Sequence, residues 1–83
     1  MRRAAISIAS NIAEGAARKG PREYVRFLYM ARGSASELDT QLEIASQLAF
    51  LGDEARVNLQ SRVDEVNRML NGMIVALTKR AHD

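Results

Sequence analysis

The feature that most constrains this chain is a long stretch, from Arg22 to Leu51, in which apolar residues recur at alternating spacings of three and four. This spacing keeps them on one side of an α-helix. The stripe comprises Leu28, Ala31, Ala35, Leu38, Leu42, Ala45 and Ala49. Further apolar residues widen it on one flank, namely Phe27, Met30, Ile44, Leu48 and Leu51. Because this arc is broader than a coiled-coil seam, we expect the helix to pack against more than one neighbour.

Both ends of the stretch carry helix-boundary residues, so we predict a helix over 22–51. Pro21 suits the first helical position, where a missing amide donor is tolerated, and Gly52 follows the last periodic residue as a C-terminal cap. Gly33 weakens the middle by roughly 1 kcal/mol relative to alanine. It is either a point of close approach by another backbone or a tolerated weak position.

Two further helices are predicted on either side of this stretch, over 2–17 and 53–80. The first has an apolar side made of Ala5, Ile8, Ala9, Ile12 and Ala16. The second has a seam made of Leu59, Val63, Val66, Leu70, Met73 and Leu77, with Asp53 as its expected N-cap. Short turns make successive helices antiparallel. We therefore predict an all-α fold, an antiparallel up-and-down helical bundle in a single domain over 1–83.

Composition excludes several classes of function. The 83 residues contain no cysteine, and the sole histidine is His82, next to the C-terminal residue. Thiolate chemistry is therefore impossible, and a carboxylate–histidine metal site lacks its ligands. We predict no catalytic residue, no metal and no cofactor. No run approaches about 18 consecutive apolar residues, so we expect a cytoplasmic protein without a membrane span.

The charge is distributed unevenly along the chain. Residues 1–33 carry seven basic and two acidic side chains, a net charge of +5, whereas residues 34–83 carry five and eight, a net charge of −3. Arginines near a tyrosine can neutralise phosphates and stack on unpaired bases. The candidate nucleic-acid-binding residues are Arg2, Arg3, Arg18, Lys19, Arg22, Arg26 and Tyr29. An equally basic surface could instead serve contacts between subunits.

Several polar residues fall near the expected helix contacts, where buried polar groups need partners. They are Ser10, Asn11, Glu14, Ser34, Glu37, Gln41 and Asn71. Ser34 and Gln41 lie within the apolar arc seven residues apart, and Asn67 and Asn71 on the last helix are their expected partners. We interpret these residues as fixing the register between helices, with a ligand site as the alternative.

Three stretches resemble a known family, the four-helix-bundle 23S ribosomal RNA intervening-sequence proteins. They are MRRAAISIASNIAEG at 1–15, FLYMARGSASELDTQL at 27–42 and MLNGMIVAL at 69–77. The resemblance implies a left-handed up-and-down bundle that assembles as a ring-like homopentamer in bacteria, with no enzymatic activity. The family is also similar to the accessory protein of diversity-generating retroelements, a basic pentamer that binds nucleic acid and a reverse transcriptase.

The chain departs from the family pattern in two places. Ala9 stands where the family usually has proline, so a straighter first segment is expected. Family members usually carry another helix before the Met-Arg-Arg segment, whereas three helices are predicted here. The expectation is therefore either a chain shortened at its N-terminus or a variant whose exposed groove is filled by another subunit.

Two functions remain open on these grounds. The first is a non-catalytic homo-oligomer that binds RNA or DNA through its basic residues. The second is a structural or protein-interaction module that assembles through apolar helix faces without nucleic acid. Since an 83-residue chain buries a modest share of its surface, oligomerisation would supply stability in either case.

Overall fold

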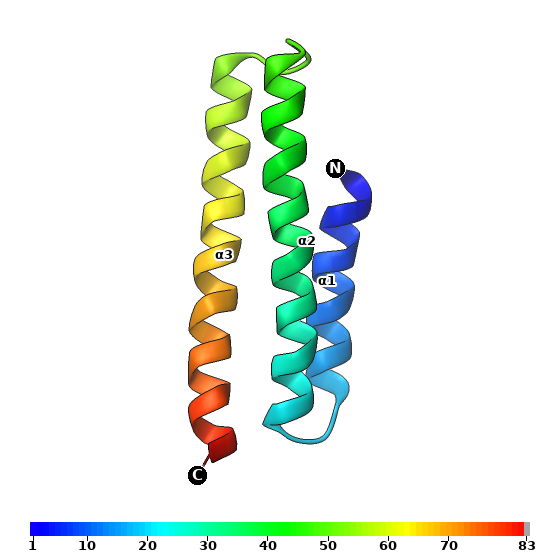
Figure 1. Cartoon of the computed structure of the whole chain (residues 1–83), viewed down its shortest axis with the longest axis vertical. Helices are drawn as coiled ribbons and strands as arrows, with labels where there is room; N and C mark the ends of the chain where they lie inside the picture. The colour runs from blue at the N-terminus through cyan, green and yellow to red at the C-terminus, as the bar shows by residue number, and fades with distance from the viewer. Residues whose placement is uncertain (83) are drawn as a thin grey trace.

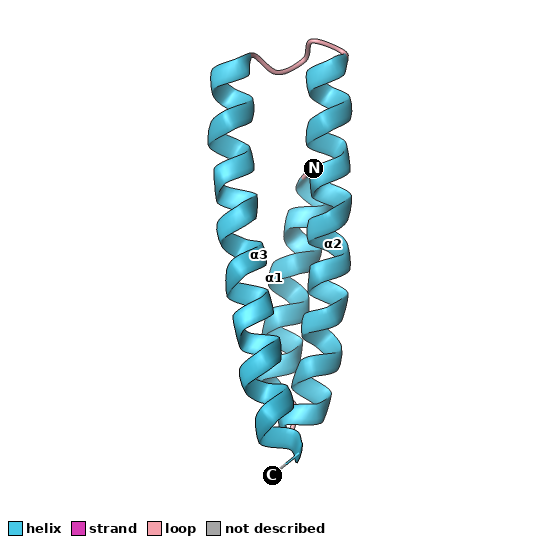
Figure 2. Ribbon diagram, turned by 60° about the vertical axis from the view of Figure 1, so that its left-hand side comes forward, coloured by secondary structure: helices cyan, strands magenta, loops and turns pink. Residues whose placement is uncertain are grey.

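Residues 1–82 form three helices that run down, up and down the long axis of a slender molecule in the view of Figure 1. The computed structural model describes residues 1–82; the His82 side chain and Asp83 lie outside the described part. Helix α1 spans Arg2–Ala17, α2 spans Pro21–Gln47 and α3 spans Asp53–His82 (Figure 1). The Cα atoms extend over 48 × 19 × 13 Å. The predicted all-α, antiparallel fold is confirmed, and the α2–α3 connection crosses the end of the molecule opposite the C-terminus (Figure 2).

Helix α2 is the structural centre, because it packs against both α1 and α3. Among the described residues, α1 and α3 make no close backbone contact with each other. Three large side chains are fully buried, those of Leu28, Leu42 and Leu70. The core cluster consists of Ile8, Leu28, Ala31, Ala35, Leu70 and Ile74. The apolar stripe of the long helix therefore does face two neighbours, as its width indicates.

The α1–α2 turn brings the two helices very close together at Gly15. A Cβ atom on Gly15 would lie 2.8 Å from Tyr24 Cδ1 and 2.9 Å from Phe27 Cβ. Gly20 then turns the chain with a φ of 96°, and Pro21 occupies the start of α2. Of the two alternatives at Gly33, the close approach is excluded and the tolerated weak position holds, because a Cβ atom there would meet nothing within 4 Å.

The long helix ends at Gln47, so the predicted end at Leu51 is wrong. Ala49 adopts a left-handed conformation with a φ of 61°. The Phe50 amide donates to the Ala45 carbonyl and the Ala49 amide to the Ser46 carbonyl. This pair of bonds is the Schellman motif, which usually places glycine in the left-handed position. Because alanine takes the place of the usual glycine, the sequence does not indicate that the helix ends here.

Helix α3 begins at Asp53 itself, so the prediction of Asp53 as N-cap is also wrong. The Arg56 amide donates to the carbonyl of Gly52 at 3.0 Å, which gives Gly52 the N-cap position. Asp53 and Glu54 then lie in the first turn, where negative charge interacts favourably with the helix dipole.

The buried side of α1 differs from the predicted apolar side. Ala4, Ile8 and Gly15 are the buried residues of this helix. The predicted Ala5, Ala9 and Ala16 are exposed, and Ile12 is half-buried. Compared with the prediction, α1 is therefore rotated about its own axis. Part of its predicted apolar side lies beside the contact with α2 rather than within it.

Candidate nucleic-acid interface

Four of the candidate basic residues lie together around the α1–α2 turn. Arg18 and Lys19 are in the turn, and Arg22 and Arg26 are in the first turns of α2. All four are exposed. The start of α2 has no side-chain N-cap, so its first amides add a positive partial charge to the same region.

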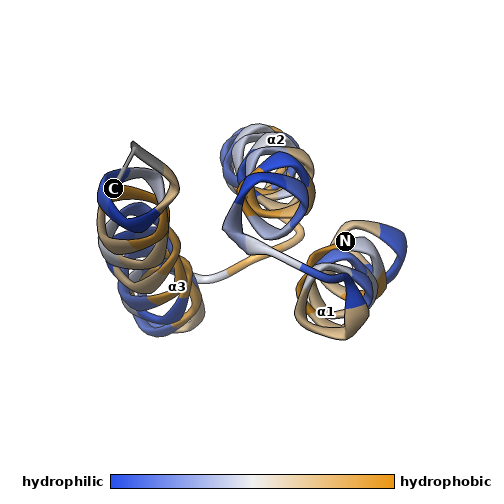
Figure 3. Cartoon of the chain, turned by 90° about the horizontal axis from the view of Figure 1, so that it is seen from below, coloured by the Kyte–Doolittle hydropathy of each residue, from blue (hydrophilic) through white to orange (hydrophobic). Residues whose placement is uncertain are grey.

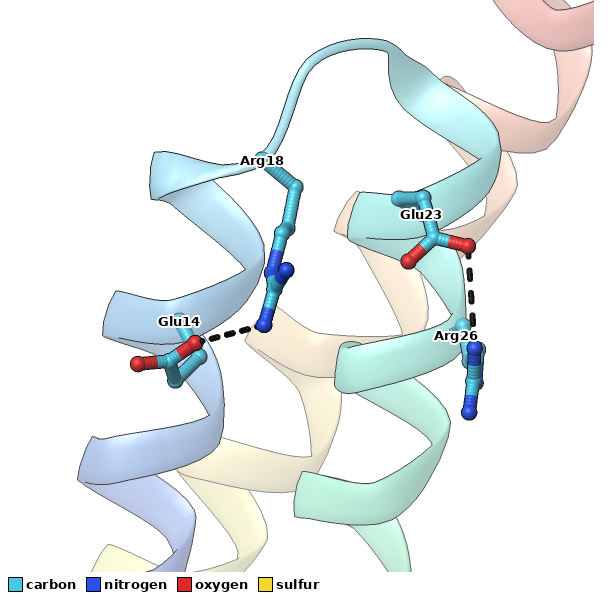
Figure 4. Close-up of polar contacts among 4 residues, drawn as sticks. All are labelled: Glu14, Arg18, Glu23 and Arg26. Atoms are coloured by element: carbon cyan, nitrogen blue, oxygen red, sulfur yellow. Dashed lines mark hydrogen bonds and ion pairs between the residues drawn. The ribbon is translucent and has the colours of Figure 1, made fainter.

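Two of these arginines are held by carboxylates on their own helices. Arg18 Nη2 lies 3.0 Å from Glu14 Oε2, and Arg26 Nη1 lies 3.7 Å from Glu23 Oε1 (Figure 4). The Arg18 guanidinium also lies 5.1 Å from the centre of the Phe27 ring. Both ion pairs are solvent-exposed, and such pairs contribute about 0–1 kcal/mol. Either arginine can therefore exchange its carboxylate for a phosphate at little cost.

The C-terminal part of α3 adds positive charge that sequence reasoning did not include. Arg22 and Val25 line a shallow pocket of about 220 Å³ together with Thr78 and Ala81 of α3. This contact brings Lys79 and Arg80, both exposed, to the same end of the molecule as the α1–α2 turn (Figure 1). We call this region the basic end; it comprises Arg18, Lys19, Arg22, Arg26, Lys79 and Arg80. The antiparallel course of α2 and α3 was the signal that could have indicated it.

Arg2 and Arg3 lie at the opposite end of α1, away from the basic end. At 1.5 Å per helical residue, Arg3 is roughly 20 Å from Arg18 along the axis. Both side chains are exposed. The structure therefore divides the candidate basic residues into two separate groups.

Tyr29 lies slightly less than one turn further along α2 than Arg26 and is 48% exposed. The Arg32 guanidinium lies 4.7 Å from the centre of its ring. Arg32 also donates from Nη1 to Asn71 Oδ1 at 3.1 Å, which fixes the guanidinium against α3. Arg32 was not among the candidates, and its stacking leaves one face of the Tyr29 ring for another group.

The polar residues of the helix contacts pair differently from expectation. Ser34 Oγ lies 2.8 Å from Ser7 Oγ, so Ser34 joins α2 to α1 and not to Asn71 of α3. Asn11 donates to the Ser7 carbonyl and to Ser7 Oγ, which completes this polar group. Glu14 faces solvent with Arg18, and Ser10 is exposed.

Gln41 also has a different partner from the expected one. Its Nε2 is 3.5 Å from Glu37 Oε1, and its buried Oε1 accepts no hydrogen bond within the described part of the chain. The polar contact between α2 and α3 is instead made by Gln60 Nε2, which donates to Asp39 Oδ1 at 2.7 Å.

Over residues 1–82, no group of three or more side chains is arranged to hold a metal ion, although the side chain of His82 falls outside that comparison. Neither does any of the described helices have the length and apolar character that a membrane span requires.

Comparison with known proteins identifies the family. The family described as 23S rRNA-intervening sequence protein matches residues 1–72. A comparison with curated proteins gives no significant match. The matched range includes α1, α2 and more than half of α3, and with it the arginines of the α1–α2 turn. The chain therefore belongs to the 23S rRNA-intervening sequence protein family.

Proposed function

We propose that this protein is a non-catalytic homo-oligomer of the bacterial cytoplasm that binds RNA or DNA through its basic end. The observation that carries the proposal is the gathering of exposed cations from three chain segments at that end. Three chain segments contribute: the turn supplies Arg18 and Lys19, α2 supplies Arg22 and Arg26, and α3 supplies Lys79 and Arg80. Clustered cations release counterions from nucleic acid on binding, which supplies most of a sequence-independent affinity.

The side chains around this end suit phosphates and unpaired bases. Arginine binds phosphate through two parallel donors, and four of the six cations of the basic end are arginines, namely Arg18, Arg22, Arg26 and Arg80. Tyr29 lies on the same side of α2 as Arg22 and Arg26, with one ring face covered by Arg32. A base stacked on the other face would extend the pair into a three-layer stack.

Self-association would multiply such contacts. Met30 and Ile44 on the outer surface of α2, and Leu48 directly after its last residue, have apolar side chains that are 50%, 50% and 58% exposed. Apolar groups grouped on one helix face indicate an interaction surface. A homo-oligomer built through this face, such as the pentamer implied by the family resemblance, would present several basic ends to one nucleic acid.

The test is a salt series of binding to a fluorescently labelled ribosomal RNA hairpin, followed by fluorescence anisotropy. We expect log affinity to fall linearly with log salt, by about 0.7–0.9 for each phosphate neutralised. The double variant Arg22→Glu/Arg26→Glu should bind at least about tenfold more weakly at low salt, with a shallower slope.

The matched control is Arg62→Glu/Arg68→Glu, which changes the net charge equally at two exposed arginines of α3 far from the basic end. It should retain most of the affinity if the basic end is the contact surface. Absence of binding to the hairpin at low salt would overturn the proposal, as would an Arg22→Glu/Arg26→Glu protein that binds like the wild type.

A second function, a protein-interaction module without nucleic acid, is favoured by one observation. The apolar side chains exposed on α2 are joined by Phe50 and Val57 near the α2–α3 connection, which are 78% and 67% exposed. In that case the basic end would contact acidic residues of neighbouring subunits. An oligomer by light scattering that fails to bind the hairpin at any salt concentration would support this second function over the first.

A further inference from the structure

We propose that the edge where α2 meets α3 carries a stacking platform for an unpaired base, so that the protein prefers single-stranded nucleic acid to duplex. The platform consists of the Tyr29 ring, the Arg32 guanidinium behind it and Asn71, which holds the guanidinium. This inference rests on the proposed function, because the same strand has to reach the basic end. Seen end on, α1 and α3 lie on either side of α2, so the α2–α3 edge is on the other side of α2 from α1 (Figure 3).

The three side chains of the platform form one continuous contact across the two helices. The Arg32 guanidinium lies 4.7 Å from the centre of the Tyr29 ring, and its Nη1 donates to Asn71 Oδ1 at 3.1 Å. The guanidinium is therefore restrained both at its flat face and at its donor edge. Because the ring is ordered in advance, a ligand that stacks on it loses less free energy to the ordering of side chains.

The Tyr29 ring remains open to a ligand on the side away from Arg32. Tyr29 is 48% exposed, although its other face carries the guanidinium. Proteins bind unpaired bases by stacking them on aromatic rings and on arginine guanidinium planes. A base inside a duplex is already stacked on its neighbours and would first have to leave the helix. The platform therefore suits a base that is unpaired from the start.

Val75 of α3 adds an apolar wall at the level of this ring. Asn71 accepts the hydrogen bond from Arg32, and Thr78 lies further along α3 in a shared pocket with Val25 of α2. Val75 lies between these two contacts, at spacings of four and three residues that keep it on the same side of α3. Its side chain is 68% exposed. An exposed valine in this position can cover the edge of a base that stacks on the ring.

The arginines at the start of α2 are placed to hold the phosphates of the same strand. Arg22 and Arg26 precede Tyr29 by seven and three residues, so all three lie on one side of the helix. At 1.5 Å per residue, the two arginines are roughly 10 and 5 Å from Tyr29 along the axis. These distances correspond to about one to three nucleotides at roughly 3.4 Å per nucleotide. One strand can therefore place a base on Tyr29 and its next phosphates at the basic end.

The charge of the protein alone would produce the opposite preference. A duplex has a higher density of phosphates than a single strand, so a purely cationic surface binds the duplex more tightly. The side chains that the platform adds beyond Arg32 are uncharged, namely those of Tyr29, Asn71 and Val75. A preference for the single strand would therefore report contact with bases rather than with phosphates.

The test compares two DNA strands of about 12 nucleotides, a length in the range of single-strand binding sites. One is an unstructured strand that carries bases, and the other is abasic throughout but has the same number of phosphates. The duplex of the first strand with its complement is the third probe. Fluorescence anisotropy measures the affinity of the full chain for each probe at the same low salt concentration. We expect the base-carrying strand to bind about tenfold more tightly than the abasic strand, and more tightly than the duplex.

Two substitutions at Tyr29 separate the ring from the rest of the side chain. Tyr29→Phe keeps the ring and should retain the roughly tenfold advantage of the base-carrying strand. Tyr29→Leu keeps an apolar side chain without a ring and should lose that advantage. Both variants should bind the abasic strand like the wild type, because the basic end is unchanged. Tyr29 is exposed, so both variants should fold, which circular dichroism checks.

Asn71 is a positioning residue that acts through Arg32, so its test follows the ring itself. The chain contains two tyrosines and no tryptophan, and in a Tyr24→Phe protein the tyrosine emission comes from Tyr29 alone. A base stacked on this ring should quench the emission. Asn71→Ala in this background should lower the quenching at saturation and reduce the advantage of the base-carrying strand by about threefold. Asn58→Ala, at another exposed asparagine of α3, is the matched control and should change neither.

Three results would overturn the proposal. The first is wild-type protein that binds the abasic strand as tightly as the base-carrying strand. The second is a Tyr29→Leu protein that retains the full advantage of the base-carrying strand. The third is Tyr29 emission that a saturating amount of this strand leaves unchanged. Binding of neither strand would overturn the proposed function together with this inference, whereas equal binding of both strands would overturn this inference alone.

Discussion

Gly15 and Gly33 are both helical glycines, but they have opposite surroundings. Gly15 is buried against the Tyr24 ring and backbone and the Phe27 side chain, whereas Gly33 faces open space on the outer surface of α2. In the sequence, Gly33 lies between Arg32 and Ser34 on the side of α2 opposite the apolar stripe, whereas Gly15 precedes two alanines near the end of α1. The close contact at Gly15 depends on the relative rotation of α1 and α2, which the sequence does not show.

Replacing each glycine with alanine should therefore change stability in opposite directions. Gly15→Ala is expected to destabilise the protein by about 1–3 kcal/mol, because the new methyl group overpacks the contact with Tyr24 and Phe27. Gly33→Ala is expected to stabilise it by about 0.5–1 kcal/mol through helix propensity alone. Urea unfolding followed by circular dichroism measures both free energies. Equal effects of the two substitutions would contradict the packing at Gly15.

The sequence predicted which basic residues could form the candidate site, but it did not predict how their side chains are arranged on the surface. The turn residues Arg18 and Lys19 are close in the chain to Arg22, so their proximity followed from the sequence. The position of Lys79 at the basic end followed from the antiparallel course of α2 and α3, but the contact of Arg32 with Asn71 depends on which sides of the two helices meet, and a period of 3.6 residues does not determine this. Ser34 likewise has apolar residues on both sides of it around the helix. The sequence therefore did not show whether its partner lies on α1 or on α3.

At the scale of the elements, the spacing of apolar residues predicted that each of the three helices exists, but it did not predict every helix end. Pro21 identifies the start of α2 because its fixed φ and missing donor suit that position alone. The other end of α2 was misplaced because Ala49 adopts a conformation that alanine rarely adopts, while Gly52, the expected cap, serves the next helix. The apolar stripe continues past Gln47 without being helical.

Glycine at position 49 should relieve this conformation. Ala49→Gly is expected to stabilise the protein by roughly 1 kcal/mol, since the left-handed region is strained for alanine and readily adopted by glycine. Ala55→Gly, at an exposed helical position of α3, is the matched control and should destabilise by a similar amount. Thermal and urea unfolding give the two differences. Loss of stability in Ala49→Gly would show that the Schellman motif is not formed in solution.

At the scale of the whole molecule, different surfaces carry different chemistry. The basic end lies at one end of the long axis, whereas the exposed Ile44 and Leu48 lie toward the other end, near the α2–α3 connection. Met30 follows Tyr29 directly and therefore lies beside the candidate nucleic-acid contact. The proposed nucleic-acid contact and most of the proposed subunit contact are thus toward opposite ends of α2.

The proposed self-association through the outer face of α2 would make stability depend on protein concentration. We expect the thermal unfolding midpoint to rise over a roughly hundredfold increase in concentration, because assembly favours the folded state by mass action. Ile44→Glu/Leu48→Glu should abolish this rise, whereas Met69→Glu/Val75→Glu, two substitutions at exposed apolar residues of α3, should leave it unchanged. A constant midpoint for the wild type would contradict assembly at these concentrations.

The central position of α2 also has a consequence for how the molecule opens. Since the backbones of α1 and α3 each come close to α2 and not to each other, we expect that either helix can detach while the other stays bound. The protein therefore has two separate routes of partial unfolding, one leaving an α2–α3 hairpin and the other an α1–α2 hairpin. Amide protons of α2 facing the core remain protected along both routes, and they are the last to exchange with solvent.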